Sequence, residues 1–209
     1  LRNKIAILFI LCIFFAGATE NVMSQWVSGY LEVTLKMNKT LCDILGLALF
    51  GLMLTVGRTL YTKFGKRIYR ALIFGSIGCA ICYLIASLTN NSILALISCS
   101  LTGFFVSMLW PGSLIAVTDR VPDANVNLFA LMAVGGDLGV TVYPEIVGAI
   151  TDFAIKNERI ISLGMKHGLT SEQLGMKIGM LFGMTAPLFA LLFFLIAYFN
   201  KKKVDKIKL

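Results

Sequence analysis

Three carboxylic acids lie well inside long apolar stretches, where a charged side chain is unexpected. Glu20 lies in the first stretch, and Asp137 and Glu145 lie in the fifth. A charged group at the centre of a bilayer costs about 2.5–3.5 kcal/mol on insertion scales, so such groups usually face a protein interior or a water-filled path. These acids are therefore the first candidates for a functional role, with proton binding as the expected chemistry.

Polar and aromatic side chains accompany the acids, as a hydrated path requires. Amides and hydroxyls there could hydrogen-bond a polar solute, and an indole could stack on a ring face. Alternatively, these groups hydrogen-bond neighbouring helices, and Trp110 is a packing aromatic. The candidate solute-binding residues are Asn21, Ser24, Gln25, Trp26, Ser107, Trp110 and Thr141.

Six apolar stretches carry these residues, and each is long enough to cross a bilayer core, which takes roughly 20 helical residues. An apolar share of 57% with only 14% charged residues excludes an ordinary soluble domain. We expect an all-α integral membrane protein, with residues 1–209 forming one six-helix domain. The predicted spans are Ile5–Tyr30, Leu41–Tyr61, Ile68–Leu88, Ile93–Thr118, Leu128–Ile150 and Ile178–Phe199.

Local signals refine these spans. Pro111 directly after Trp110 predicts a break in the fourth span. Thr170 and Gln173 have the spacing of a capping box, which predicts a short helix leading into the last span. Two pairs of glycines predict close helix packing, namely Gly135 with Gly139 and Gly179 with Gly183.

The depth of the acids follows from the rise of about 1.5 Å per helical residue. Asp137 is expected near the midplane, and Glu20 and Glu145 in the outer third. No Lys or Arg is expected at that depth, so the acids are paired outside the chain, protonated or hydrated. The third and sixth spans have few polar residues and are expected to face lipid, whereas the first, fourth and fifth are expected to face a cavity.

The distribution of basic residues predicts the orientation. Most of the 19 Lys and Arg residues fall at the two ends of the sequence and in the second and fourth connections. Because basic loop residues are retained in the cytoplasm, we expect a multi-pass protein of the cell membrane with both termini cytoplasmic. This topology accounts for the net charge of +8 without nucleic acid. We find no metal cluster, nucleotide loop or hydrolase motif, so we expect no cofactor, no metal and no enzymatic activity.

The second connection carries a signature rich in glycine and basic residues. Gly57-Arg58 ends one span, and Gly65-Lys66-Arg67 precedes the next. This pattern resembles the cytoplasmic loop signature of major facilitator superfamily transporters. The resemblance extends to the spans on either side. Glu20, Trp26 and Tyr30 are similar to the seventh helix of fucose and other sugar porters of that family, and residues 103–111 and 135–148 are similar to their tenth and eleventh helices.

The resemblance implies that this chain is the C-terminal half of a twelve-helix transporter, built from two inverted three-helix repeats. In that architecture the first and fourth helices line the central cavity, the second and fifth pack against the other half, and the third and sixth face lipid. The loop signature implies a cytoplasmic gate formed by an arginine and an acidic partner. The residues that match it are Gly57, Arg58, Gly65 and Arg67, with Asp119 as the nearest acidic candidate.

We therefore expect a secondary active transporter that moves a small polar solute, such as a sugar, by proton-coupled alternating access. Asp137, Glu20 or Glu145 would carry the proton. The expected partners are the solute, protons, the lipid bilayer, and a second six-helix half that lies upstream in the same chain or is a second copy. Two alternatives stay open: efflux of cationic or amphipathic drugs by the same fold, and a membrane scaffold or sensor that transports nothing.

Overall fold

The computed structural model describes residues 4–64, 67–121 and 124–207, and these form an all-helical bundle. Among these residues, six helical segments are long and apolar enough to cross a membrane. The predicted all-α, six-span class is thus confirmed. The segments are Lys4–Leu35, Lys39–Thr62, Ile68–Leu88, Ser92–Thr118, Val126–Lys156 and Ser171–Lys201.

Three of the segments are single helices and three are interrupted. The single helices are α1 (Lys4–Leu35), α4 (Ile68–Leu88) and α7 (Val126–Lys156). The interrupted segments are α2 (Lys39–Leu41) with a π-helical turn (Cys42–Gly46) and α3 (Leu47–Phe64), α5 (Ser92–Val106) with α6 (Leu109–Thr118), and α9 (Ser171–Gly183) with α10 (Thr185–Ile207). A further helix, α8 (Glu158–Lys166), lies in the long connection.

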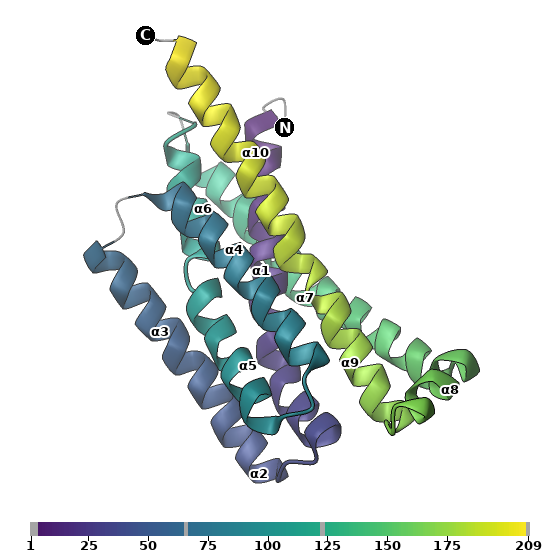
Figure 1. Ribbon diagram of the computed structural model, residues 1–209. Coiled ribbons are helices and arrows are strands. Elements are labelled where there is room, and N and C mark those ends of the chain that lie inside the picture. The colour runs from purple at the N-terminus through teal and green to yellow at the C-terminus, as the bar shows by residue number, and fades with distance from the viewer. Residues whose placement is uncertain (1–3, 65–66, 122–123, 208–209) are drawn as a thin grey trace.

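The helices surround α1, which contacts α5, α6, α7, α9 and α10. The N- and C-terminal ends lie at the same end of the bundle, as an even number of crossings requires (Figure 1). Helix α3 packs on α5 at one edge (Figure 1). The most extensive helix contact joins α1 to α7, so these two helices form the frame on which the others are placed.

Polar caps fix the starts of several helices. The side chains of Asn91, Asn125 and Asn157 accept hydrogen bonds from the first backbone amides of α5, α7 and α8. Such a cap satisfies amides that have no intrahelical partner. The predicted capping box is confirmed, because Thr170 and Gln173 each accept the other's backbone N–H at the start of α9. At the same end, the buried ammonium of Lys177 donates to the carbonyls of Ser87 and Thr89 and closes the C-terminus of α4.

The fourth span breaks at Ser107 and Met108, between α5 and α6. The prediction placed this break at Trp110-Pro111, three residues too late. Proline removes an amide donor and its ring crowds the carbonyl four residues earlier, so the distortion lies one turn before the proline. Pro111 itself lies in the first turn of α6.

Glycines allow α1 and α7 to approach closely, as predicted. A Cβ on Gly139 would collide with the backbone carbonyl of Phe14, and a Cβ on Gly135 would lie 2.7 Å from the side chain of Ile10. The second predicted pair packs closely too: Gly179 lies against Thr151, and Gly183 lies against Tyr83.

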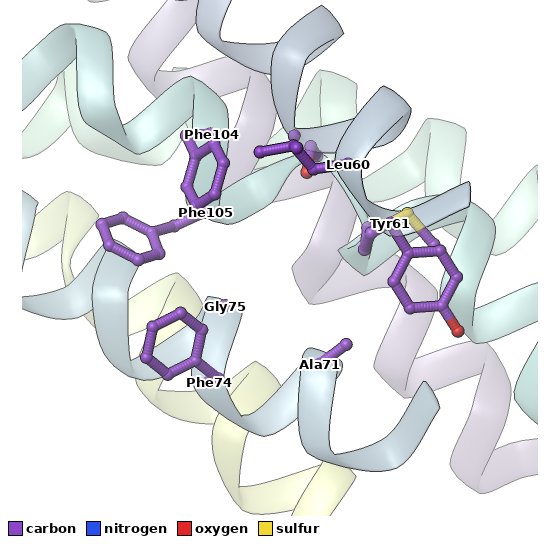
Figure 2. A pocket seen from close by; sticks show the side chains of 10 residues that line it. Leu60, Tyr61, Ala71, Phe74, Gly75, Phe104 and Phe105 are labelled. Carbon is purple, nitrogen blue, oxygen red and sulfur yellow. The ribbon is translucent and has the colours of Figure 1, made fainter. Parts of the chain in front are cut away.

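An apolar cavity of about 230 Å³ separates α3 from α4. Side chains of three helices surround it, including Leu60 and Tyr61 of α3, Phe74 of α4, and Phe104 and Phe105 of α5 (Figure 2). Its lining offers almost no hydrogen-bonding group, so it is unsuited to a polar solute.

The α1–α7 contact yields the first prediction. Gly139→Ala should lower the thermal unfolding temperature of the purified protein, because the added methyl group meets backbone that cannot move aside; overpacking of this kind costs about 1–3 kcal/mol. Gly51→Ala is the matched control, since a Cβ there meets nothing within 4 Å and alanine favours helix by up to about 1 kcal/mol. Equal unfolding temperatures for the two variants would contradict the close-packing role of Gly139.

Candidate functional site

A second cavity, of about 400 Å³, is polar and lies between α1, α3, α6 and α7. Its size falls within the range of small-molecule sites. It brings together residues that are distant in sequence and that combine both signs of charge. The lining consists of Gly17, Glu20, Asn21, Ser24, Arg58, Trp110 and Val140.

An ion pair crosses this cavity. Nη2 of Arg58 lies 3.8 Å from Oε1 of Glu20, and the two side chains are 48% and 29% exposed. No cation was predicted at the depth of Glu20, and this prediction was wrong. Side chains on a helix point back toward its N-terminus, so the long Arg58 side chain extends along α3 away from the end at which α3 finishes and reaches the depth of Glu20.

Arg58 is held in this position by a hydrogen bond to a carbonyl that has lost its helical donor to a proline. Pro111 has no N–H, so the carbonyl of Ser107 lacks the donor that the next helical turn would normally supply. Nε of Arg58 donates to this oxygen at 3.2 Å. Gly57 permits the approach, because a Cβ there would lie 2.7 Å from the carbonyl oxygen of Phe104. The Gly57-Arg58 pair is therefore fitted to the break in the fourth span.

Asn21 makes an equivalent contact on the other side of the cavity. Pro144 lies inside α7, so the carbonyl of Val140 loses its helical donor in the same way. Nδ2 of Asn21 donates to that oxygen at 2.8 Å. Asn21 lines the cavity, and its amide nitrogen joins α1 to α7 at the proline, while its predicted role in binding solute stays a prediction.

Trp110 packs between two helices and also borders the cavity. Its indole ring fills the space beside Gly136 of α7, where a Cβ would overlap the ring, and it lies 2.8 Å from the Cβ position of Gly17 in α1. Both interpretations of Trp110 therefore have a structural basis, because the ring packs against α1 and α7 and Trp110 also lines the cavity.

The other candidate solute ligands are divided between the cavity and other surfaces. Ser24 lines the cavity, and its hydroxyl donates to the backbone oxygen of Asn21 at 3.2 Å. Ser107 is buried and borders the apolar cavity instead. Gln25 is exposed. Trp26 packs beside Gly148, where a Cβ on the glycine would lie 3.6 Å from the indole ring. Neither Gln25 nor Trp26 lines the polar cavity.

The acids of α7 lie away from Glu20. Asp137, Thr141 and Glu145 follow at intervals of four and are all exposed. The Thr141 hydroxyl donates to the Asp137 backbone carbonyl at 2.8 Å, within its own helix. These three residues form an uncovered polar stripe on the bundle surface, and none of them lines the polar cavity.

The residues expected to form the gate are also separated. Asp119 lies 3.1 Å from the ammonium of Lys201 on α10, whereas Arg58 faces Glu20. Arg67 is exposed at the start of α4. Gly65 and Lys66 lie outside the described residues. The Arg58–Asp119 pairing is therefore not present in this conformation. Asp119 pairs instead with Lys201.

Sequence reasoning missed Gly17 and Val140 as parts of the site. Gly17 contributes a backbone surface without a side chain, and Val140 contributes the carbonyl that Pro144 leaves without a helical donor. The signal that could have found Val140 was available, because Pro144 follows it by four residues just as Pro111 follows Ser107. No comparable signal pointed to Gly17, whose role depends on the position of Trp110 in another helix.

Comparison with known families agrees with this architecture. Residues 1–144 match the sequence model of the Major Facilitator Superfamily. The chain belongs to the Major Facilitator Superfamily. It is thus a multi-pass membrane protein of a transporter family, and its six spans correspond to one half of the major facilitator fold. No curated protein and no solved structure matched the chain. The match is to the superfamily, so the sugar-porter subgroup stays a prediction.

The contact between Asn21 and Val140 can be tested by a double-mutant cycle. Asn21→Leu leaves the Val140 carbonyl without a donor and should destabilise the protein by about 1–3 kcal/mol. In a Pro144→Ala background the new amide at residue 144 supplies that donor, so the same change should cost much less. Thermal unfolding measures both losses, with the exposed Gln25→Leu as control. Equal losses in the two backgrounds would show that Asn21 does not compensate for the proline.

Proposed function

We propose that this chain works as part of a secondary active transporter that moves a small polar solute, such as a sugar, coupled to protons. The observation that carries the proposal is the placement of Glu20 and Arg58 together in a polar cavity of the transporter fold. A carboxylate that faces a guanidinium changes its interactions when it binds a proton, so proton occupancy and the shape of the cavity are linked.

Glu20 is the proposed proton-binding group. It lies on α1, the central helix, and borders the cavity together with Ser24 and Trp110. When the cavity opens to one side, Glu20 takes up a proton, the pair with Arg58 is lost, and solute binds. When it opens to the other side, the proton and the solute leave. Alternating access of this kind arises from movement of one half of the fold against the other around a central site.

The exposed stripe on α7 supports a second six-helix half as a partner. Asp137, Thr141 and Glu145 lie on a face that the described residues leave uncovered, and carboxylates facing hydrocarbon are costly. We place the second half against this face, whether it lies upstream in the same chain or belongs to a second copy. In the assembled protein Asp137 and Glu145 would then border the space between the halves, where a role in proton transfer remains part of the proposal.

Drug efflux is disfavoured by one observation. Acids within a membrane can serve as counter-ions for cationic drugs, but Glu20 already faces the cation Arg58. A second cation in this cavity would be repelled by the guanidinium. A polar solute that is not cationic fits the charges better.

The proton-coupling role predicts a specific transport defect. Glu20→Gln should abolish accumulation of solute driven by a proton gradient, because the side chain can no longer exchange a proton, while solute exchange across the membrane without a gradient continues. The assay is uptake into proteoliposomes with and without an imposed pH gradient. Glu172→Gln, at an exposed acid in the first turn of α9, is the matched control.

Asp137→Asn in the same assay separates the two acidic positions. Loss of gradient-driven accumulation in Asp137→Asn, with Glu20→Gln unaffected, would move the proton site to α7. Absence of any solute flux under every gradient would favour a scaffold or sensor.

The proposed orientation places the N- and C-terminal ends in the cytoplasm of a multi-pass protein of the cell membrane. Asn90 is exposed and Arg120 is half-buried, and the two lie in connections at opposite ends of the bundle. All five native cysteines are buried. An introduced Asn90→Cys should therefore react with an impermeant maleimide added to intact cells, whereas Arg120→Cys should react only after the membrane is opened. The reverse pattern would invert the topology.

A further inference from the structure

We propose that the transported solute carries a carboxylate, and that Arg58 binds this carboxylate in competition with Glu20. The ligand class is a hydroxylated organic monoanion, such as a sugar acid. This inference rests on the proposed transport function and names the substrate class of the same cavity.

The guanidinium of Arg58 has unused hydrogen-bond donors. Arginine carries five N–H groups, and the hydrogen bond to the Ser107 carbonyl uses the one on Nε. The Glu20 oxygen lies 3.8 Å from Nη2, which is longer than a hydrogen bond. Among the described residues, the terminal N–H groups of Arg58 have no hydrogen-bond partner. They border the polar cavity, because Arg58 is part of its lining.

The geometry of this edge favours a carboxylate over a neutral hydroxyl. With Nε fixed on Ser107, the two terminal nitrogens present a planar fork, which matches the two oxygens of a carboxylate. A neutral hexose could occupy only part of the fork, since a single hydroxyl offers one oxygen. The rigid anchor at Ser107 also reduces the ordering that binding requires.

Charge balance links this anion to the proton. Glu20 and Arg58 together are neutral, so an added carboxylate would leave an uncompensated negative charge in a partly buried site, which is unfavourable. A proton on Glu20 restores neutrality and frees the guanidinium at the same time. The solute anion and the proton therefore favour each other's binding, and by linkage each raises the affinity for the other by the same factor.

The surroundings of Glu20 contain no competing cation among the described residues. Arg58 is the charged group that faces it from α3. On α4 the nearby titratable groups are buried: the thiol of Cys79, and Tyr83, whose hydroxyl donates to the Thr19 carbonyl at 2.8 Å. The cations and acids of the other packed helices lie elsewhere: Lys177 at the end of α4, Lys201 with Asp119, and Asp137 and Glu145 on the exposed face of α7.

The central comparison is between glucuronate and glucose, which differ only at one carbon. The complete protein is reconstituted in proteoliposomes, and exchange of radiolabelled glucuronate is compared with exchange of glucose, with lactate and gluconate as further monocarboxylates. We expect exchange of at least one monocarboxylate with about tenfold or greater preference over its neutral counterpart. The concentration of monocarboxylate that gives half-saturation should fall as the pH is lowered, because a protonated Glu20 releases Arg58.

Substitutions of Arg58 and Glu20 test whether the preference for a monocarboxylate arises in the polar cavity. Arg58→Lys should weaken binding of the preferred acid about tenfold, corresponding to the loss of a charge-assisted hydrogen bond, with little change for glucose. Arg159→Lys, at an exposed residue of α8, is the matched control. Glu20→Gln should bind the acid at least as tightly as the native protein and without dependence on pH. This last readout holds even if Arg58→Lys does not fold.

The possible failures are distinguishable. Exchange of glucose with no exchange of any monocarboxylate overturns the carboxylate proposal and leaves the transport function standing. The same conclusion follows if Arg58→Lys weakens glucose and acid equally, which would mean that Arg58 is structural or is occupied by a carboxylate of the second half. Absence of flux for every solute overturns both proposals.

Discussion

The carbonyls of Ser107 and Val140 are the constraint on which the site depends. Each precedes a proline by four residues and so has no amide donor from the next helical turn. In a membrane no bulk water replaces that donor, so another protein group must supply it. Arg58 and Asn21 do so from α3 and α1. Both interactions satisfy the backbone and also place a polar side chain in the cavity.

The same arrangement accounts for the glycines around the cavity. A side chain can reach a backbone carbonyl in a neighbouring helix only if the two helices approach closely. Gly57 allows this for α3 and α5, and Gly139 allows it for α1 and α7. Gly17 and Gly136 leave room for the ring of Trp110 between those helices. Close packing and the polar contacts are thus linked, because the glycines let Arg58 and Asn21 reach the carbonyls that lack a helical donor.

The ion pair of Glu20 and Arg58 gains its importance from partial exposure. In a fully buried pair, loss of one partner would leave an uncompensated buried charge, and a fully exposed pair would contribute little. Here both side chains are partly open to a cavity, at a separation too long for a direct hydrogen bond. The pair is thereby open to the cavity, as the proposed exchange with a proton or a ligand requires, whereas the acids of α7 are exposed on the bundle surface.

The sequence by itself determined the six-span helical class, the capping box at Thr170 and the close-packing glycines, because each depends on local composition or on residues within a few turns. It also identified Glu20, Ser24 and Trp110, which the cavity brings together. Only the tertiary structure decided that Arg58 faces Glu20 rather than Asp119, and that Asn21 binds a backbone carbonyl. The direction of a long side chain and the position of a released carbonyl depend on which helices are neighbours, and residues 119 positions apart, such as Asn21 and Val140, carry no local signal of their contact.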